Sequence, residues 1–586
     1  MHFRSLIAGL AALQLSALDS QSGALPAAKV RVWNQLGPFG GPAEFVVTSP
    51  STPNLLWAGS PNAMLYRTRD AGESWIHLPF PAEQASTLHV ILPHPADAAR
   101  LLAGVSPDSG GTGLFLSVDG GEAWRGVESF QGKAVWALAH FPADPRVMVA
   151  GASDGVYQSG NAGETWRRIS SERDGDLQPA VSVAIHPTKP EIIYAGTPHL
   201  PWKTVNAGQT WQSIHAGMLD DSDVFSIDIN LREPTRLFAS ACSGIYRSLT
   251  GGRAWTKLRG SADASFRTYI VAQDPHVAGR VWAGTTHGLI RSADHGLTWR
   301  TVSPHSVKSI AFDHRHPGTL YLATRDAGLL RATNSDTFTP VNRGFTNRGF
   351  FALAAAGGSL WLAGEGAGMW KSADGGRKWE RSAAAERVLT ISACGDGGSL
   401  FAAGQGFLRQ WMAERWTALN EPRREAVRSV ACPNGAPSGG LLAVSSRAAY
   451  ASRDSGKTWT QLSQPADPSI EWNQIAAAPG SGAVIAATSH GLLRSVDAGQ
   501  AWTRAAGDLG EGTVASVLVH PDRPGHAFAA QYDRIFFSSD DGRGWKPLAA
   551  QGLERAAIRA LAIAKGWPNR LYALVAGRGV FSIDLE

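Results

Sequence analysis

Short runs in which apolar side chains alternate with small or polar ones recur along the whole chain, separated by turns rich in Gly and Pro. Val181–Ile185 is one such run, and Ile192–Thr197 is the next. Between them, His186–Pro190 contains two prolines, which fix φ and have no N–H to donate to a ladder. Alternation with a period of two predicts strands. Two further short strands complete the unit, so each unit is expected to contain four.

An eight-residue segment ends the third strand of most units and returns roughly every 43 residues. It has the form Ser/Thr-x-Asp/Asn/Thr-x-Gly-x-x-Trp. Its ten copies contain Asp70 and Trp75, Asp119 and Trp124, Asn161 and Trp166, Asn206 and Trp211, Thr250 and Trp255, Asp294 and Trp299, Asp374 and Trp379, Asp454 and Trp459, Asp497 and Trp502, and Asp540 and Trp545. Asp or Asn accepts hydrogen bonds from nearby backbone N–H groups, Gly supplies a positive φ, and Trp buries a large apolar face. We therefore interpret all of these residues as structural and none as catalytic.

The repeat length predicts the fold. Four strands in about 43 residues is typical of one blade of a β-propeller. Degenerate units at Thr333–Phe338 and around Trp416 fill the two longer gaps between segments, which gives thirteen units. Because one ring usually has four to eight blades, we predict an all-β chain with two tandem β-propellers of about seven plus six or seven four-stranded blades. The expected boundaries are 29–340 and 341–586.

The two ends of the chain are predicted to pair. Val30–Trp33 has the pattern of an isolated fourth strand, and Gly579–Ser582 has the pattern of a third strand without a partner. Pairing them would complete a terminal blade and remove exposed sheet edges. On this hypothesis the N-terminal ring could borrow the last unit of the chain.

The N-terminus has the features of an export signal. His2 and Arg4 precede the apolar run Leu6–Leu18, and small residues follow at Ser22–Ala24. The run is too short to span a bilayer. We therefore interpret residues 1–24 as a signal peptide and expect a soluble periplasmic or extracellular protein.

Composition narrows the function further. Apolar residues make up 44% and charged residues 18% of the chain, which suits a large core. A formal charge of +5 without a basic block argues against nucleic-acid binding. Cys242, Cys394 and Cys432 have no metal-ligand spacing, and we expect small buried thiols rather than a disulfide. No cofactor and no metal site are predicted, and we expect a monomer.

The repeats resemble those of a known protein superfamily. The Ser-x-Asp-x-Gly-x-x-Trp signature is similar to the Asp-box of the sialidase-type (BNR) repeat superfamily. That superfamily includes sialidases, the sortilin ectodomain, xyloglucanase-type glycoside hydrolases and the photosystem II assembly and stability factor. His186–Trp211 and Ala283–Trp299 look most like the repeats of the last of these. The resemblance implies a propeller over nearly the whole chain and says little about activity.

The resemblance to xyloglucanases implies a test for catalysis. Those enzymes place two catalytic Asp residues between their rings, one of them in an Asp-Ile-Gly-Gly stretch of the first blade. Here the corresponding stretch, Gly59–Tyr66, has no carboxylate. The resemblance therefore supports the fold more than the activity.

Two acidic segments remain as candidates for function. Asp220, Asp221 and Asp223 precede the expected inner strand Val224–Asp228, and Glu471-Trp472-Asn473 occupies the equivalent place in the second half. Carboxylates at a ring mouth suit a cation or sugar hydroxyls, and an acid beside an aromatic suits carbohydrate stacking. The alternative for both is an ordinary solvated turn.

Basic residues follow a regular and an irregular pattern. Six directly precede the repeated segments, which suggests a role in the repeat or at the surface: Arg67, Lys203, Arg247, Arg291, Lys371 and Arg494. Arg348 and Arg428 do not repeat and are candidates for lining a mouth. We therefore expect an exported, non-catalytic scaffold that binds a protein or glycan. The alternative is a divergent polysaccharide hydrolase that uses Asp220, Asp221 or Asp223 with Glu471 as its acid pair.

Overall fold

The computed structural model describes residues 31–81, 86–107, 110–171, 177–219, 222–260, 266–334, 336–364, 367–382, 388–394, 398–412, 415–433, 440–465, 467–478, 482–553 and 556–585. The predicted signal peptide, 1–24, lies outside these residues. Within them the chain is almost entirely strands, and its helices are the short 3₁₀ turns η1 (Glu128–Phe130) and η3 (Pro422–Arg424). The predicted all-β class is confirmed. No helix in the described ranges is long and apolar enough to cross a membrane.

The first seven antiparallel sheets formed by the described residues have four strands each, ordered from the inner to the outer edge as they follow in the chain. They are β2 (Phe45–Thr48), β3 (Leu56–Gly59), β4 (Leu65–Thr68) and β5 (Ile76–Leu78); β6 (Thr87–Pro93), β7 (Leu101–Ser106), β8 (Leu114–Ser117) and β9 (Arg125–Gly126); β10 (Val135–Phe141), β11 (Asp144–Ala152), β12 (Gly155–Ser159) and β13 (Arg167–Arg168); β14 (Ser182–Ile185), β15 (Ile193–Gly196), β16 (Pro201–Thr204) and β17 (Gln212–Ser213); β18 (Val224–Ile229), β19 (Leu237–Ala241), β20 (Gly244–Ser248) and β21 (Thr256–Lys257); β22 (Thr268–Gln273), β23 (Val281–Thr285), β24 (Gly288–Ser292) and β25 (Arg300–Ser303); and β26 (Val307–Phe312), β27 (Thr319–Thr324), β28 (Leu329–Thr333) and β29 (Thr339–Pro340).

Six more sheets follow among the described residues. They are β30 (Ala352–Ala356), β31 (Ser359–Gly364), β32 (Gly368–Ser372) and β33 (Glu380–Ser382); β34 (Thr390–Ala393), β35 (Leu400–Gly404), β36 (Phe407–Met412) and β37 (Arg415–Leu419); β38 (Ser429–Ala431), β39 (Leu441–Val444), β40 (Ala449–Ser452) and β41 (Thr460–Gln461); β42 (Trp472–Ala477), β43 (Val484–Thr488), β44 (Gly491–Ser495) and β45 (Thr503–Arg504); β47 (Ser516–Val519), β48 (Ala527–Gln531), β49 (Arg534–Ser538) and β50 (Gly544–Pro547), with β46 (Ala506–Gly507) parallel to β50; and β51 (Ile558–Ala562), β52 (Arg570–Val575) and β53 (Gly579–Asp584), joined by β1 (Asn34–Gly37).

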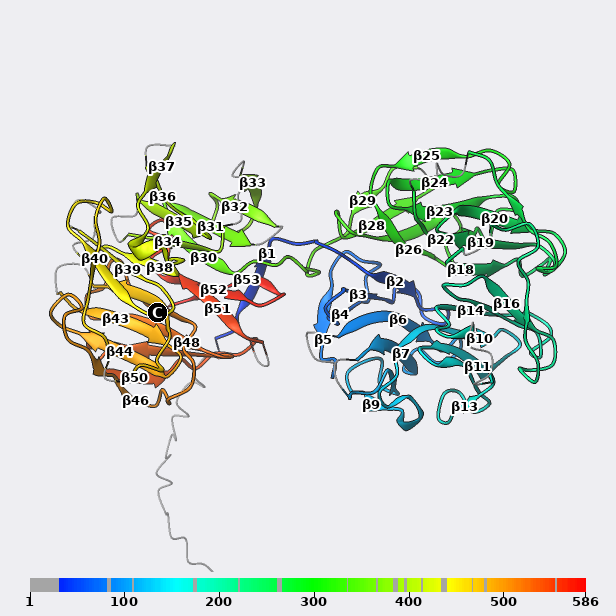
Figure 1. Ribbon diagram of the computed structural model, residues 1–586, viewed down its shortest axis with the longest axis horizontal. Coiled ribbons are helices and arrows are strands. Elements are labelled where there is room, and N and C mark those ends of the chain that lie inside the picture. Colours follow the sequence, from blue (N-terminus) through cyan, green and yellow to red (C-terminus); the bar gives the residue numbers. More distant parts are fainter. Residues whose placement is uncertain are drawn as a thin grey trace, which may run out of the picture.

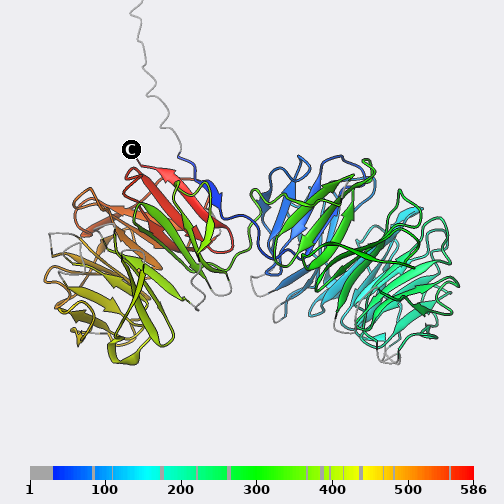
Figure 2. The same cartoon turned by 90° about the horizontal axis from the view of Figure 1, so that it is seen from above.

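The innermost strands contact one another in two closed cycles. β2, β6, β10, β14, β18, β22 and β26 follow in order, and β26 returns to β2. β30, β34, β38, β42, β47 and β51 form the second cycle, in which β51 returns to β30. We call these the N-terminal ring (β2–β29) and the C-terminal ring (β30–β53 with β1), and they lie side by side (Figure 1, Figure 2).

Each cycle closes through an apolar cluster between its first and last sheets. In the N-terminal ring, Trp75 and Tyr66 pack with Tyr321 and Leu329. In the C-terminal ring, Leu360 and Leu362 pack with residues of β52 and β53, and partly buried Leu36 of β1 joins them. Each sheet thus covers an apolar face that its neighbour would otherwise expose.

The predicted pairing of the chain ends is confirmed, with different residues at the N-terminal side. β1 runs antiparallel to β53, with Asn34 opposite Ser582 and Gln35 opposite Phe581 (Figure 1). The strand therefore lies at 34–37 rather than 30–33, because Trp33 instead donates its backbone N–H to Gln551 at 3.0 Å. The expectation that the N-terminal ring borrows the last unit is wrong. The C-terminal ring borrows β1, so this part of the 29–340 assignment needs correction.

Two crossing segments join the rings and hydrogen-bond to each other. Gly40 N–H donates to Phe345 O at 2.8 Å, and Asn347 N–H donates to Gly40 O at 2.9 Å. Gly41 has φ +109°, and a Cβ there would lie 2.5 Å from Asn347 O, so only glycine fits. Arg348 donates to Phe39 O at 3.4 Å and lies over the Trp370 ring. This corrects its expected place at a ring mouth: Arg348 holds the crossing.

The repeated segments form one tight turn. In the copy that ends at Trp299, Ser292 donates to Asp294 Oδ1 at 2.8 Å and accepts from Gly296 N–H at 2.8 Å. The Asp294 carboxylate also accepts from the backbone and hydroxyl of Thr298, at 2.9 and 2.6 Å. Asn161 replaces Asp in another copy, where its Nδ2 donates to Thr165 Oγ1 at 2.9 Å. The Asp and Asn side chains therefore close turns.

The basic residue before a repeated segment couples neighbouring sheets. It donates to the backbone carbonyl at the fourth position of the next segment, in the pairs Arg67 with Gly120, Lys203 with Gly251, Arg247 with His295, Arg331 with Ala71 and Arg494 with Asp541. Arg331 does this across the closure of the N-terminal ring. Arg291 and Lys371 differ: Arg291 donates to the Asp336 carboxylate of the next sheet at 2.5 Å, and Lys371 lies over the Trp361 ring of its own sheet. A cation satisfies a carbonyl that the turn leaves free, which explains the regular spacing.

We predict that Leu36→Asp destabilises the C-terminal ring selectively. The carboxylate would enter the cluster that Leu36 shares with Trp379 and Val580, at a cost of about 2 kcal/mol or more. Hydrogen–deuterium exchange should rise in 352–382 and 558–584 and stay unchanged in 87–168. Leu297→Asp, at a leucine that is 61% exposed, is the control. Equal loosening of both rings by Leu36→Asp would contradict the role of β1.

We predict that the Asp294 carboxylate contributes to folding stability and that this contribution is lost at acid pH. Hydrogen bonds from the Thr298 hydroxyl and N–H, and from Ser292, lower its pKa from 3.8 to about 2. A lowered folded-state pKa stabilises the protein above pH 3.8, and this contribution disappears as pH falls toward 2. Asp294→Asn should keep a melting temperature close to wild type, since Asn161 closes the same turn, and should weaken the acid dependence. Asp294→Ala should lower the melting temperature at pH 7. Equal losses for both variants would contradict the turn assignment.

Candidate functional site at the mouth of the C-terminal ring

Two innermost strands of the C-terminal ring contain a bulge near their first residue, at the mouth of the ring. In β42, Trp472 pairs with Thr488 and Gln474 pairs with Ala487, which leaves Asn473 as an extra residue. In β51 the extra residue is Arg559. A bulge of this kind re-aims a side chain. The corresponding residues of the C-terminal ring are Phe351, Leu389, Arg428, Asn473, Ala515 and Arg559.

All six of these residues line one cavity of about 850 Å³. Glu425, Arg447 and Glu471 line the same cavity, together with Ser445 and Thr513. A second cavity of about 110 Å³ follows along the ring axis, since Leu353, Ile391 and Gln474 line both. The C-terminal ring therefore has an open mouth that narrows into a channel. Arg428, Glu471 and Asn473, three residues of the sequence-derived hypotheses, meet there.

Arg428 organises this mouth. Its Nη1 donates to Glu471 Oε2 at 3.2 Å, to Trp472 O at 3.0 Å and to Asn473 Oδ1 at 3.2 Å. Asn473 Nδ2 in turn donates to Val514 O at 2.9 Å. Arg428 thus ties its own strand to the next sheet and holds the Glu471 carboxylate in an ion pair.

Glu425, the other acidic residue of the mouth, also accepts a hydrogen bond. Ser445 Oγ donates to Glu425 Oε2 at 2.5 Å. The Glu425 carboxylate raises the pKa of Tyr450 through its charge and a hydrogen bond, an effect second to the burial of that phenol. Ser445 also accepts from the backbone N–H groups of Arg447 and Ala448, at 3.2 and 3.1 Å. The turn that presents Arg447 is therefore fixed by the same acid and hydroxyl.

In the N-terminal ring, side chains at the positions equivalent to these mouth residues contact one another. Lys308 Nζ lies 2.9 Å from Glu44 Oε1 and 4.6 Å from the centroid of the Tyr269 ring. The His89 and Trp136 rings are 6.3 Å apart. Burial, with a smaller contribution from Lys308, lowers the pKa of His89 to about 4, so this imidazole is neutral at pH 7. Several side chains at these positions are therefore paired with one another.

The predicted acid pair is not brought together in the described residues. Asp223 directly precedes β18 in the N-terminal ring, where its backbone O accepts from Cys242 N–H at 3.1 Å. Glu471 precedes β42 in the C-terminal ring, and the sheets that carry β18 and β42 lie at opposite ends of the molecule (Figure 1). Asp220 and Asp221 lie outside the described residues.

Gly59–Tyr66, the stretch that corresponds to the one with a catalytic Asp in xyloglucanases, lies at the contact between the rings. Ser60 Oγ donates to Asn62 Oδ1 at 2.6 Å. A Cβ at Gly577 of the C-terminal ring would lie 2.6 Å from Met64 Sδ and 3.6 Å from Asn62 Nδ2. Tyr66 donates to Thr346 O at 2.7 Å. An amide and a thioether therefore occupy this position.

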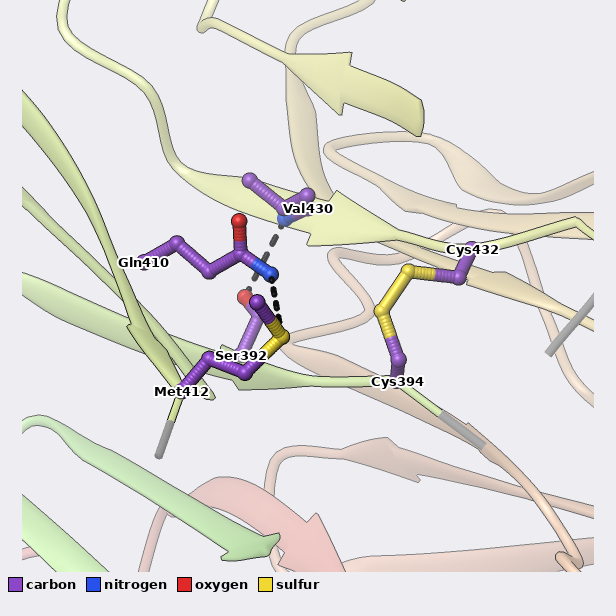
Figure 3. The surroundings of a disulfide bond; sticks show 6 residues. All are labelled: Ser392, Cys394, Gln410, Met412, Val430 and Cys432. Atoms are coloured by element: carbon purple, nitrogen blue, oxygen red, sulfur yellow. Dashed lines mark hydrogen bonds between the residues drawn. A yellow bond between two sulfur atoms is a disulfide. The ribbon is translucent and has the colours of Figure 1, made fainter. Parts of the chain in front are cut away.

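Cys394 and Cys432 form a disulfide, which corrects the expectation of buried thiols (Figure 3). Cys394 follows β34 and Cys432 follows β38, and the two Cα atoms are 5.3 Å apart. The separation of the two cysteines in sequence does not indicate a bond, because they are brought together only by the packing of two adjacent innermost strands. Val430 N–H donates to Ser392 Oγ at 3.1 Å across the same pair of strands. The disulfide lies at the narrow cavity, whereas Cys242 is free.

Comparisons with known proteins agree with this fold. Residues 116–393 match the family described as Photosynthesis system II assembly factor YCF48. A search of the curated proteins gives no match. The GH74 xyloglucanase from Xanthomonas campestris superposes with a TM-score of 0.73 at 16% identity, over 95% of this chain and 100% of that one. The GH74 enzyme from Niastella koreensis gives a TM-score of 0.69 at 15% identity, over 94% and 99%.

These matches confirm the resemblance derived from the repeats. The repeats over residues 116–393 are similar to the BNR repeats of the photosystem II assembly factor family, and the fold of the chain is similar to that of GH74 xyloglucanases. Identities of 15–16% carry the fold alone.

Reduction of the disulfide is predicted to destabilise the C-terminal ring. The bond joins residues 38 apart, for which loop-closure entropy gives about 4 kcal/mol. Chemical denaturation should shift to lower denaturant when a reductant is added, and Cys394→Ala with Cys432→Ala should reproduce the shift. Cys242→Ser, which leaves the bond intact, should respond to reductant as wild type does. An unchanged midpoint in the double variant would contradict the prediction.

Proposed function

We propose that this protein is an exported, non-catalytic scaffold that binds a protein or glycan at the mouth of its C-terminal ring. The observation that carries the proposal is the contrast between the rings. At equivalent positions the N-terminal ring pairs its own side chains, whereas the C-terminal ring lines a cavity of about 850 Å³ with Arg, Asn and apolar groups. A concave site with a few converging polar groups is typical of ligand binding.

The scaffold on this proposal is a pair of tandem propellers. We assign seven blades to the N-terminal propeller and six to the C-terminal one, with the boundary near residue 340. The C-terminal propeller includes β1. The Ser-x-Asp-x-Gly-x-x-Trp segments serve as structural Asp-boxes of the blades, and no cofactor or metal is assigned to either ring.

Export is part of the proposal. Residues 1–24 are proposed as a signal peptide, and the protein as a periplasmic or extracellular monomer. The Cys394–Cys432 disulfide supports this location, because such bonds persist in oxidising compartments and are rare in the cytosol.

The alternative is a polysaccharide hydrolase of xyloglucanase type. The similarity of fold to the Xanthomonas campestris xyloglucanase over nearly the whole chain favours it. Glycoside hydrolysis needs two carboxyl groups about 5–10 Å apart across the scissile bond. Asp223 and Glu471 belong to different rings, and Glu471 is engaged by Arg428. We therefore rank the scaffold first.

A reducing-end assay separates the two functions. The purified protein should release no sugar from xyloglucan or from a panel of plant and bacterial polysaccharides. Release that disappears in Asp223→Asn or Glu471→Gln, with unchanged melting curves, would overturn the scaffold proposal. A GH74 xyloglucanase in the same panel is the positive control.

A further inference from the structure

The charges of the C-terminal mouth are unbalanced once its ion pairs are taken into account. Arg428, Arg447 and Arg559 line the cavity with Glu425 and Glu471. Arg428 is paired with Glu471, and Glu425 accepts from Ser445. Arg447 and Arg559 are exposed, so the three arginines and two glutamates of the lining leave a net charge of +1. Guanidinium groups are always protonated and match the geometry of carboxylates.

The net charge of the chain is also unevenly divided between the segments that form the two rings. Residues 341–586 contain 26 of the 54 Lys and Arg and 21 of the 49 Asp and Glu, a formal excess of +5. Residues 1–340 contain 28 of each. All of the net charge therefore belongs to the half of the chain that has the open mouth, which favours encounter with an anionic partner.

Apolar side chains occupy one arc of this mouth. Phe351 is 42% exposed and Leu389 is 37% exposed, although both line the cavity. Since β51 contacts β30, β30 contacts β34 and β34 contacts β38, the order around the ring is Arg559, Phe351, Leu389, Arg428. An exposed apolar arc is thus flanked by an arginine on each side.

We propose that this mouth binds an acidic peptide segment with apolar side chains, presented by an exported protein partner. The carboxylates of the peptide would lie against Arg559 and Arg447, and an apolar side chain would lie against Phe351 and Leu389. An aliphatic Leu beside Phe suits an apolar amino-acid side chain, whereas sugar rings stack on aromatic faces. The inference rests on the proposed scaffold function and names its ligand.

Fluorescence anisotropy of labelled peptides tests this inference. The probe is a fluorescein-labelled nonapeptide in which Glu alternates with Leu, and the matched peptides carry Gln for Glu or Ser for Leu. We expect binding of the first peptide that weakens with salt, and loss of binding for both matched peptides. Arg559→Ala and Arg447→Ala should each weaken binding about fivefold, and Phe351→Ser about tenfold.

Control variants separate a local site from general charge. Arg453→Ala removes one exposed cation from a repeated segment outside the cavity and should leave affinity unchanged. Affinity lost equally in Arg453→Ala, or no binding of the acidic peptide, would overturn the inference. Binding of polygalacturonate that depends on Arg559 would also overturn it in favour of an acidic glycan, while the scaffold function would stand. Sugar release in the reducing-end assay would overturn the scaffold function itself.

Discussion

Every sheet in the described residues has apolar faces that only neighbouring sheets can cover, so stability depends on closing each ring. In the N-terminal ring, Arg331 reaches Ala71 and Glu73 across the closure, beside the cluster of Trp75 and Tyr321. In the C-terminal ring, β51 returns to β30, and a strand from the other end of the chain completes the outer edge of the last sheet. A ring that is completed by residues 34–37 cannot be finished until both termini are in place.

This borrowed strand also fixes how the rings are joined. The chain leaves β1, crosses to the N-terminal ring, and returns through residues 341–351. The two crossings hydrogen-bond to each other at Gly40 and are held by Arg348 on Trp370. A double connection restrains the relative motion of the two rings more than a single linker would.

Much of this fold could be predicted from the sequence because each repeat contains the residues that determine its own turn and strands. The Ser-x-Asp-x-Gly-x-x-Trp pattern specifies a turn whose hydrogen bonds lie within five residues, as at Asp294, and the strands follow from alternation. The Cys394–Cys432 bond could not be predicted in this way. Its closeness arises between adjacent innermost strands, and residues 38 apart in sequence carry no local sign of it.

The candidate site was visible only in part for a similar reason. Arg428 stands out in the sequence as an unrepeated basic residue, and Glu471 and Asn473 stand out beside Trp472 at the entry to an expected inner strand. Nothing in the segments around Arg559 and Phe351 marks those two residues. The signal that finds them is their position near the start of each innermost strand: Arg559 is the extra residue between two ladder pairs of β51, and Phe351 directly precedes the first pair of β30. At this position the fold sets only where a side chain points. The sequence is therefore free to place Lys308, Glu44 and Tyr269 in contact with one another in one ring and to line a cavity in the other.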